Sequence, residues 1–220
     1  MSNAARPDRG RARGGVDRWV PGRALLRAAD PRMADLVDAK PSLNPDLLFD
    51  RLPSDLWGAL VLQVIGQQLS LAAAAAILTR LEALQGGRMP TPAELLATDA
   101  ERLRGIGMSH AKAVYLHDLA ARLEDGRLEL DRLRTLDDDA ARGALTEVKG
   151  VGRFTADGVL MPALRRPDVW PAADLAFRRA VERIWELDPP ASVEQVDALG
   201  ERFQPWRTLA AAYLYSSVES

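Results

Sequence analysis

The chain has 220 residues, of which 47% are hydrophobic and 27% are charged, a composition typical of one sizeable globular domain or of two small lobes that share a cleft. It contains no cysteine, which excludes disulfides, thiolate catalysis, cysteine-bound zinc and iron–sulfur clusters. A net charge of −2 argues against a broad basic surface for nucleic acid. No apolar run approaches the roughly 20 residues of a membrane span, and we expect a cytoplasmic protein.

Residues 1–22 are predicted to form a disordered basic arm. The first 23 residues contain six Arg and two Asp and no apolar segment, so they resemble neither a secretory signal nor a packed element. This region contributes +4 to the total charge, and the body of the chain therefore carries −6. A body of that charge can bind DNA only through a few charged groups and well-placed backbone.

Capping signals divide the rest of the chain into short helices. Most of the predicted helices follow a Ser, Thr or Asp, the residues whose side chains accept bonds from first-turn N–H groups, and TPAE at 91–94 reads as a capping box. The predicted helices cover residues 54–66, 70–85, 109–125, 137–146, 192–203 and 205 onward, with another beginning at Thr91. Strand alternation is almost absent, so the sequence predicts an all-α protein.

A glycine pattern occurs twice between such helices. Residues 103–112 read LRGIGMSHAK, and residues 148–157 read VKGVGRFTAD. In the second copy, Gly150 and Gly152 allow a tight turn and the close approach of a ligand. The helix that follows directs unpaired N–H groups outward, which suits a phosphate held by backbone. A plain turn between helices is the alternative. A dinucleotide site is disfavoured, because a helix precedes the turn and Thr155 replaces the third glycine.

The ordered motifs resemble the helix-hairpin-helix (HhH-GPD) DNA glycosylases, and most closely their 3-methyladenine DNA glycosylase II (AlkA-like) branch. The resemblance covers about residues 45–218 and is carried by VIGQQLS (64–70), the two glycine repeats, DVWPAADLAFRRA (168–180) and PWRTLAAAYLY (205–215). It implies two helical lobes with a cleft between them, one of about residues 55–135 and the other of 23–54 with 136–220. We expect no counterpart of the N-terminal β domain of longer members.

By this resemblance, Asp174 is the catalytic carboxylate. Residues 171–174 read as the entry to a helix, where the dipole favours an ionised acid. A carboxylate stabilises the oxocarbenium charge that develops on deoxyribose, and an alkylated purine, already cationic, leaves without a second acid. Without the resemblance, Asp174 reads as a helix cap that pairs with Arg178.

The resemblance also implies the base pocket and the reaction type. Members that cut the DNA backbone have a Lys nucleophile where this chain has Phe154, which implies a monofunctional glycosylase whose Phe154 stacks on the extruded base. Tyr215 matches a second pocket aromatic. Trp57 and Trp170 are further pocket candidates, with core packing as the alternative for each. Gly158 stands where the best-known member has an aromatic, so the pocket shape differs.

The DNA contacts implied by the resemblance are of three kinds. The wedge that fills the gap left by a flipped base is the turn Gln67, Gln68 and Leu69, with Gln68 or Leu69 inserted and core packing as the alternative for Leu69. The DNA-binding hairpin consists of Lys149, Gly150, Val151, Gly152, Arg153, Thr155 and Ala156. A second backbone contact comes from Gly105, Gly107, Ser109 and Lys112.

The family hairpin holds a monovalent cation, which implies a structural Na⁺ or K⁺ at the backbone carbonyls of Thr146, Val148 and Val151. No other cofactor is expected, because His110 and His117 have no third metal ligand nearby in sequence.

We therefore expect a monomeric enzyme that binds damaged duplex DNA and removes alkylated purines, such as 3-methyladenine and 7-methylguanine, without cutting the strand, in the first step of base excision repair. A glycosylase for deaminated or etheno bases, and a non-catalytic module that binds distorted DNA, stay open as alternatives.

Overall fold

The computed structural model describes residues 17–50, 52–53 and 55–218, and this part of the chain is helical without a strand. Its helices are α1 (Val20–Ala29), α2 (Pro31–Ala39), α3 (Pro45–Phe49), α4 (Leu56–Gly66), α5 (Leu71–Leu84), α6 (Pro92–Ala97), α7 (Ala100–Gly105), α8 (His110–Glu124), α9 (Leu130–Thr135), α10 (Asp138–Thr146), α11 (Arg153–Leu160), α12 (Leu175–Trp185), α13 (Val193–Gly200), the 3₁₀ helix η1 (Glu201–Phe203) and α14 (Arg207–Val218). None in these ranges has the length and apolar character of a membrane span. The all-α prediction is confirmed.

The residues that predicted helix starts form the expected bonds. The side chains of Asp55, Ser70, Ser109 and Asp137 accept from first-turn N–H groups at 2.7, 3.2, 3.3 and 2.8 Å. Thr91 forms both bonds of a capping box with Glu94. These bonds satisfy N–H groups that have no partner inside the helix, which explains why the starts could be found from sequence.

The prediction of a disordered arm is wrong for residues 17–22. Trp19 is completely buried, and its Nε1 donates to Asp46 Oδ2 at 2.9 Å. Its ring stands edge-on to Trp206, with centroids 5.8 Å apart, and α1 begins at the next residue. A single large aromatic therefore anchors the end of an otherwise Arg-rich segment. The rest of the predicted arm, residues 1–16, lies outside the described residues, as does Ser54.

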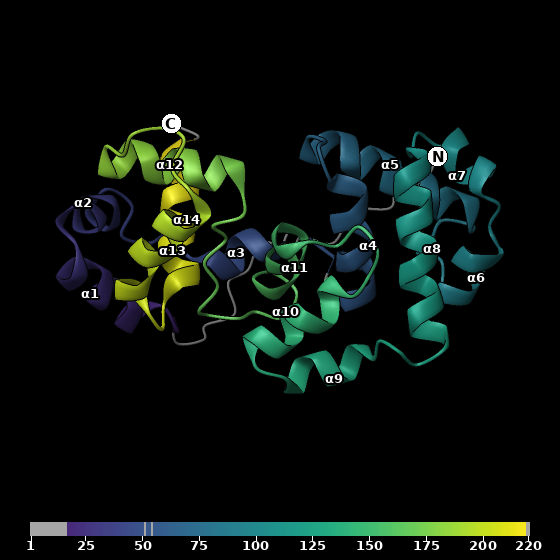
Figure 1. Ribbon diagram of the computed structural model, residues 1–220, viewed down its shortest axis with the longest axis horizontal. Helices are drawn as coiled ribbons and strands as arrows, with labels where there is room; N and C mark the ends of the chain where they lie inside the picture. The colour runs from purple at the N-terminus through teal and green to yellow at the C-terminus, as the bar shows by residue number, and fades with distance from the viewer. Residues whose placement is uncertain (1–16, 51, 54, 219–220) are drawn as a thin grey trace, which may run out of the picture.

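The helices form two lobes (Figure 1). One lobe contains α4 to α8, in which α4 packs on α5 and α6 packs on α8. The other contains α1, α2 and α12 to α14, in which α14 packs on α2 and α12. The core of this second lobe is aromatic, with Trp170, Phe177, Phe203 and Tyr213 almost completely buried.

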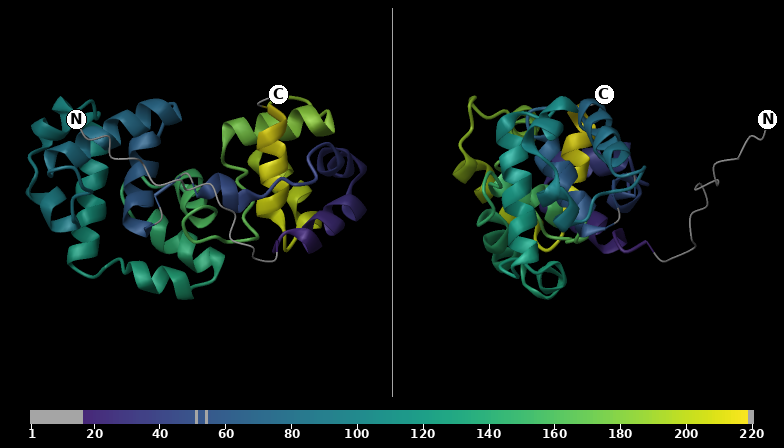
Figure 2. Two further views of the ribbon diagram at one scale, coloured as in Figure 1. Left: turned by 180° about the vertical axis from the view of Figure 1, so that it is seen from behind. Right: turned by 90° about the vertical axis from the view of Figure 1, so that its right-hand side faces the viewer.

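The glycine hairpin, α10 and α11, lies between the lobes, with α3 beside it (Figures 1 and 2). Helix α11 packs against α10 and against α4. The predicted division put residues 136–160 wholly in the second lobe, whereas α11 of the hairpin packs against α4 of the first lobe. Side chains from α3, α4, α11 and α14 therefore meet at the junction.

Candidate active site

A cavity of about 280 Å³ lies on α9 and α10, but none of the predicted site residues lines it; those residues line a second cavity, of about 230 Å³, at the junction of the lobes. The lining residues of this junction cavity are Phe49, Gln63, Phe154, Gly158, Met161, Pro162, Pro171, Asp174 and Tyr215. Three of them, Phe154, Asp174 and Tyr215, were predicted as site residues although they span 62 positions of the chain. The cavity is mainly apolar and aromatic, with few polar groups, as is usual for a small-molecule site.

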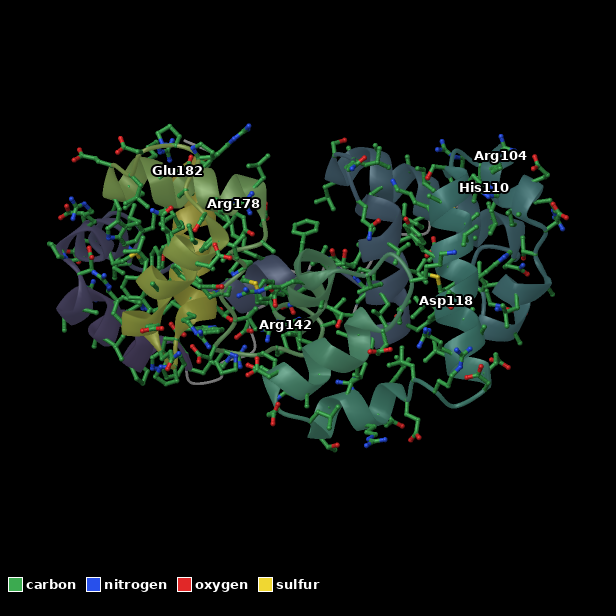
Figure 3. The ribbon with its side chains drawn as sticks, viewed as in Figure 1. Arg104, His110, Asp118, Arg142, Arg178 and Glu182 are labelled. Atoms are coloured by element: carbon green, nitrogen blue, oxygen red, sulfur yellow. The ribbon has the colours of Figure 1, made fainter. Side chains whose placement is uncertain are left out.

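Asp174 is the N-cap of α12, and both of its oxygens accept a hydrogen bond. Oδ1 accepts from the Ala176 N–H at 2.7 Å, and Oδ2 accepts from Tyr215 Oη at 2.6 Å. The alternative interpretation of Asp174 included an ion pair with Arg178. That pair does not form, because the guanidinium (labelled in Figure 3) donates to the carbonyls of Ala172 and Ala173 at 3.0 and 3.1 Å. Asp174 is thus both a helix cap and a wall of the cavity.

Tyr215 is held on α14 with its hydroxyl turned toward Asp174. Its ring packs on Phe177, with centroids 5.4 Å apart. Burial raises the pKa of the Tyr215 hydroxyl well above its ordinary value, and the nearby Asp174 charge raises it further. The hydroxyl therefore stays protonated and donates to the carboxylate.

Phe154 lies in the first turn of α11 and is 44% exposed. Exposing so much of a large apolar side chain to water is unfavourable, and a flat apolar partner that covers the ring would remove this cost. Since Phe154 and Tyr215 both line the junction cavity, the two aromatics predicted to sandwich a base are brought together.

Trp57 and Trp170 do not line the cavity, so their prediction as pocket residues is wrong. Trp57 is buried in α4 and its Nε1 donates to the Pro90 carbonyl at 2.7 Å. Trp170 Nε1 donates to the Val196 carbonyl at 2.8 Å, and its ring stands edge-on to Phe177 at 4.7 Å. Both rings are core residues with satisfied N–H groups.

Five lining residues were missed by the sequence analysis: Phe49, Gln63, Met161, Pro162 and Pro171. Gln63 had a detectable signal, since it is the one polar side chain in the run from Leu56 to Ile65. Phe49 had no such signal, because α3 lies beside the cavity only once the chain has folded.

The glycine turn of the hairpin depends on Gly150 but not on Gly152. Gly150 has φ +77°, and a Cβ there would lie 2.3 Å from the Tyr115 ring. Gly152 has φ −98°, and a Cβ there would meet nothing within 4 Å. No side chain caps α11 at Gly152, so its first N–H groups are left for a ligand or for water. The missing side chain at Gly152 is therefore not needed for packing inside the protein. It leaves open space in front of α11, on the solvent side.

Several predicted hairpin contacts are turned inward. Val151, Thr155 and Ala156 are buried, and the Ala156 N–H already donates to the Gly152 carbonyl at 3.0 Å. Gln67 Nε2 donates to the Gly150 carbonyl at 2.9 Å and to Thr155 Oγ1 at 3.0 Å. The side chains at these positions are therefore not available to DNA.

Arg153 is neutralised by acidic side chains rather than presented to a phosphate. It forms two bonds of 2.7 Å with Asp197 and lies 3.7 Å from the buried carboxylate of Asp157. Arg142 (Figure 3) donates to the same Asp157 at 2.8 Å. The prediction of Arg153 as a DNA contact is corrected, and Lys149, which is exposed, is the hairpin's remaining cation.

The residues predicted to form the second backbone contact differ in whether they are available to DNA. In the first glycine repeat, Gly107 has φ +99° and Gly105 is exposed, but Ser109 caps α8. Lys112 Nζ donates to the Ile65 carbonyl at 2.8 Å, and burial lowers the pKa of its ammonium. The Lys112 side chain is thus committed to α4 rather than to DNA.

The wedge turn between α4 and α5 exposes two of its three residues. Gln67 donates to the hairpin, which leaves Gln68 and Leu69, the two predicted candidates, as the residues of this turn available for insertion. Gln68 is exposed in a left-handed conformation, with φ +58°, which is uncommon for a residue other than glycine. Leu69 is 41% exposed, so it is not a core residue, and it lines a small cavity with Gln63 and Phe154.

A family model described as "HhH-GPD superfamily base excision DNA repair protein" matches residues 61–205. The chain belongs to the HhH-GPD superfamily. The resemblance stated from sequence is therefore confirmed, and relatives place this HhH-GPD protein near the 3-methyladenine glycosylases. DNA-3-methyladenine glycosylase 1 of Schizosaccharomyces pombe is 32% identical over 194 residues, covering 87% of this chain and 84% of that relative. YfjP of Bacillus subtilis is 28% identical over 76% of this chain, which spans 61% of that relative's length.

Solved structures agree with this HhH-GPD assignment. The Schizosaccharomyces pombe 3-methyladenine DNA glycosylase Mag1 in complex with abasic DNA superposes with a TM-score of 0.80 at 28% identity, covering 91% of this chain and 97% of that one. A DNA-3-methyladenine glycosidase from Bacillus halodurans gives a TM-score of 0.77 at 27% identity, with coverage of 91% and 90%.

Proposed function

We propose that this HhH-GPD protein is a DNA glycosylase that hydrolyses the N-glycosidic bond of 3-methyladenine and other alkylated purines, 7-methylguanine among them, in duplex DNA and leaves the strand uncut. The observation that carries the proposal is the Asp174 carboxylate, which is held by two hydrogen bonds in the wall of an aromatic cavity. The names of the relatives support the class of substrate.

The cavity suits a base that has been rotated out of the duplex. Base extrusion costs a few kcal/mol and costs less at damaged pairs. Phe154 and Tyr215 offer aromatic faces to the extruded base, and π faces attract cationic rings. An alkylated purine is cationic, so the cavity favours it over a normal base.

The bond then breaks with the electron pair going to the base. The cationic purine leaves as a neutral molecule, and positive charge develops on the deoxyribose. The Asp174 carboxylate stabilises this charge, and water adds to C1′ and releases a proton to solvent. Because Ala176 N–H and Tyr215 O–H already hold both oxygens, the carboxylate is oriented before the reaction begins.

The phosphate beside the damaged nucleotide binds the open end of α11. The first N–H groups of α11 have no side-chain cap, and Gly152 lets a phosphate approach them. Gln68 or Leu69 fills the gap in the base stack from the wedge turn. Gly105 and Gly107, which are exposed in the first glycine repeat, provide a second backbone contact.

A monovalent cation at the hairpin is compatible with the donor set. The carbonyls proposed to hold it belong to Thr146, Val148 and Val151, and carbonyl oxygens suit alkali cations. Val148 O accepts the Val151 N–H at 3.0 Å, which leaves one lone pair of that oxygen for the cation. The cation would supply positive charge next to the bound phosphate.

The lining residues support a reaction that leaves the strand uncut. A lyase needs an amine nucleophile that attacks C1′, and no lysine is among the described residues that line the cavity. The test is incubation with methylated duplex DNA, with free base and strand breaks scored separately. We expect release of 3-methyladenine without strand breaks. Strand breaks that appear without added amine would contradict the monofunctional reaction, and binding without any base release would favour a non-catalytic module.

A further inference from the structure

Gln63 is a polar side chain in the cavity wall to which the chemistry above assigns no part. It projects from α4, a helix whose neighbouring residues Leu62 and Val64 are buried, and it is itself half-buried. The other polar side chains that line the cavity, Asp174 and Tyr215, bind each other. The Gln63 amide is therefore the group with hydrogen-bonding capacity left for a bound base.

The orientation of this amide is set by the hairpin helix. Gln63 Nε2 donates to the Gly158 carbonyl at 2.8 Å, and a carbonyl can only accept, so the NH₂ end must face it. Within the described ranges, no N–H or O–H donates to Oε1 of Gln63. That oxygen accepts no hydrogen bond from the protein, and it becomes an unmet acceptor, which is costly, once a base fills the cavity and displaces water.

Gly158 makes room for this arrangement. A Cβ at position 158 would lie 2.6 Å from Gln63 Oε1 and 2.9 Å from its Cδ. The amide thus occupies the place into which a side chain from α11 would extend. The two residues, which are 95 positions apart, form a matched pair.

We propose that Gln63 is a specificity-determining residue whose Oε1 accepts a hydrogen bond from the exocyclic amino group of an extruded adenine derivative. The proposal rests on the proposed function and narrows its substrate class. A 3-methylated adenine keeps this amino group and gains acidity from its positive charge, which strengthens the bond. In 1,N⁶-ethenoadenine the same nitrogen has lost its hydrogens to the etheno bridge, and hypoxanthine has a carbonyl at this position. Both leave Oε1 without a donor and bind less tightly. 7-Methylguanine also has a carbonyl at this position, so we expect it to be a poorer substrate than 3-methyladenine.

The test measures binding selectivity, which needs no catalysis. Two duplexes differ only in the central base, 3-methyl-3-deazaadenine, which keeps the amino group and resists hydrolysis, or 1,N⁶-ethenoadenine. Fluorescence anisotropy gives the ratio of their dissociation constants. For the wild type we expect a preference of at least about tenfold for the amino base, the value of one hydrogen bond to an acceptor that the bound base buries.

Two variants alter the Gln63 amide in different ways. Gln63→Met keeps the length of the side chain and removes the acceptor, and we expect the preference to fall to about one through weaker binding of the amino base. Gly158→Ala leaves Gln63 in place but displaces its amide, with the same expected result. Gly143→Ala on α10 is the matched control, because a Cβ there meets nothing within 4 Å, and it should keep the wild-type preference.

The outcomes separate this proposal from the proposed function. A preference that survives both Gln63→Met and Gly158→Ala overturns the role of Gln63, as does an equal loss of affinity for both bases. If Gln63→Met does not fold, the result for Gly158→Ala decides. Release of 3-methyladenine from methylated DNA is measured separately, so a protein that discriminates the two duplexes but releases no base would refute the glycosylase and keep the specificity residue.

Discussion

Tyr215 donates a hydrogen bond of 2.6 Å from its hydroxyl to Asp174 Oδ2, and this bond joins α14 to the start of α12. A neutral donor orients the carboxylate without cancelling its charge. An arginine at the same place would form an ion pair and weaken the field that the carboxylate exerts on the cavity. Arg178, one turn along α12, is kept away from Asp174 by its bonds to two carbonyls.

Replacing Tyr215 with Phe should slow base release but leave DNA affinity unchanged. The substitution keeps the ring in the cavity wall and removes only the bond to Asp174. A hydrogen bond to a charged group contributes about 1.5–3 kcal/mol, so we expect the single-turnover rate to fall at least about tenfold. A wild-type rate in Tyr215→Phe would show that the hydroxyl plays no part in positioning Asp174.

The same hydroxyl predicts a loss of stability at alkaline pH. Burial, followed by the Asp174 charge, raises the pKa of Tyr215 above its ordinary value of 10.0. As pH rises through 10, the unfolded chain loses this proton while the folded protein keeps it, so the free energy of unfolding falls. Urea denaturation between pH 8 and 11 should show a shallower decline for Tyr215→Phe. Part of the decline should persist, since burial also raises the pKa of Tyr213, and identical pH slopes for the two proteins would refute the assignment.

Gly152→Ala should weaken DNA binding without affecting the fold. A methyl group at this position meets nothing in the protein but lies where the proposed phosphate approaches α11. We expect the dissociation constant for a duplex with an abasic site to rise about tenfold, with an unchanged melting temperature. Gly143→Ala, equally open in the free protein, serves as the control and should bind like the wild type. Equal affinities for all three proteins would remove the α11 end from the binding site.

Lys149 and Arg153 should differ in what they contribute, although both belong to the hairpin. Lys149 is exposed, so Lys149→Ala should reduce the slope of log K against log salt by about 1. Arg153 is bound to Asp197, so Arg153→Ala should keep the slope and lower the free energy of unfolding by about 1 kcal/mol, a modest value because the pair is partly exposed. The reverse pattern would mean that Arg153 leaves Asp197 to bind DNA.

Features of the sequence that act locally predicted much of this structure. Caps such as Ser70 and Asp137 and the positive φ of Gly150 concern only a few neighbouring residues, so the helices and the hairpin could be located. Which aromatics face the cavity could not be predicted in this way, because Trp170, in the segment before α12, and Tyr215, on α14, differ in their place in the folded chain and not in their local pattern. The order of the family motifs identified Asp174 and Tyr215, but not the bond between them.

The structural roles that could not be predicted from the sequence have one physical cause in common. Phe49 and Gln63 contribute to the cavity only because α3 meets α14, and α4 meets α11, across long separations in sequence. The burial of Trp19 likewise depends on its contacts with Asp46 and Trp206, which the Arg-rich composition around it conceals.

The central claim is that the charge of Asp174, and not its shape, accelerates base release. Asp174→Asn keeps a side chain of the same size that can still accept from the Ala176 N–H. The decisive measurement is the single-turnover rate of 3-methyladenine release from methylated duplex DNA by this variant, with its affinity for abasic DNA measured alongside. We predict a fall of about 100-fold or more in rate with unchanged affinity, whereas equal rates for the variant and the wild type would contradict the account.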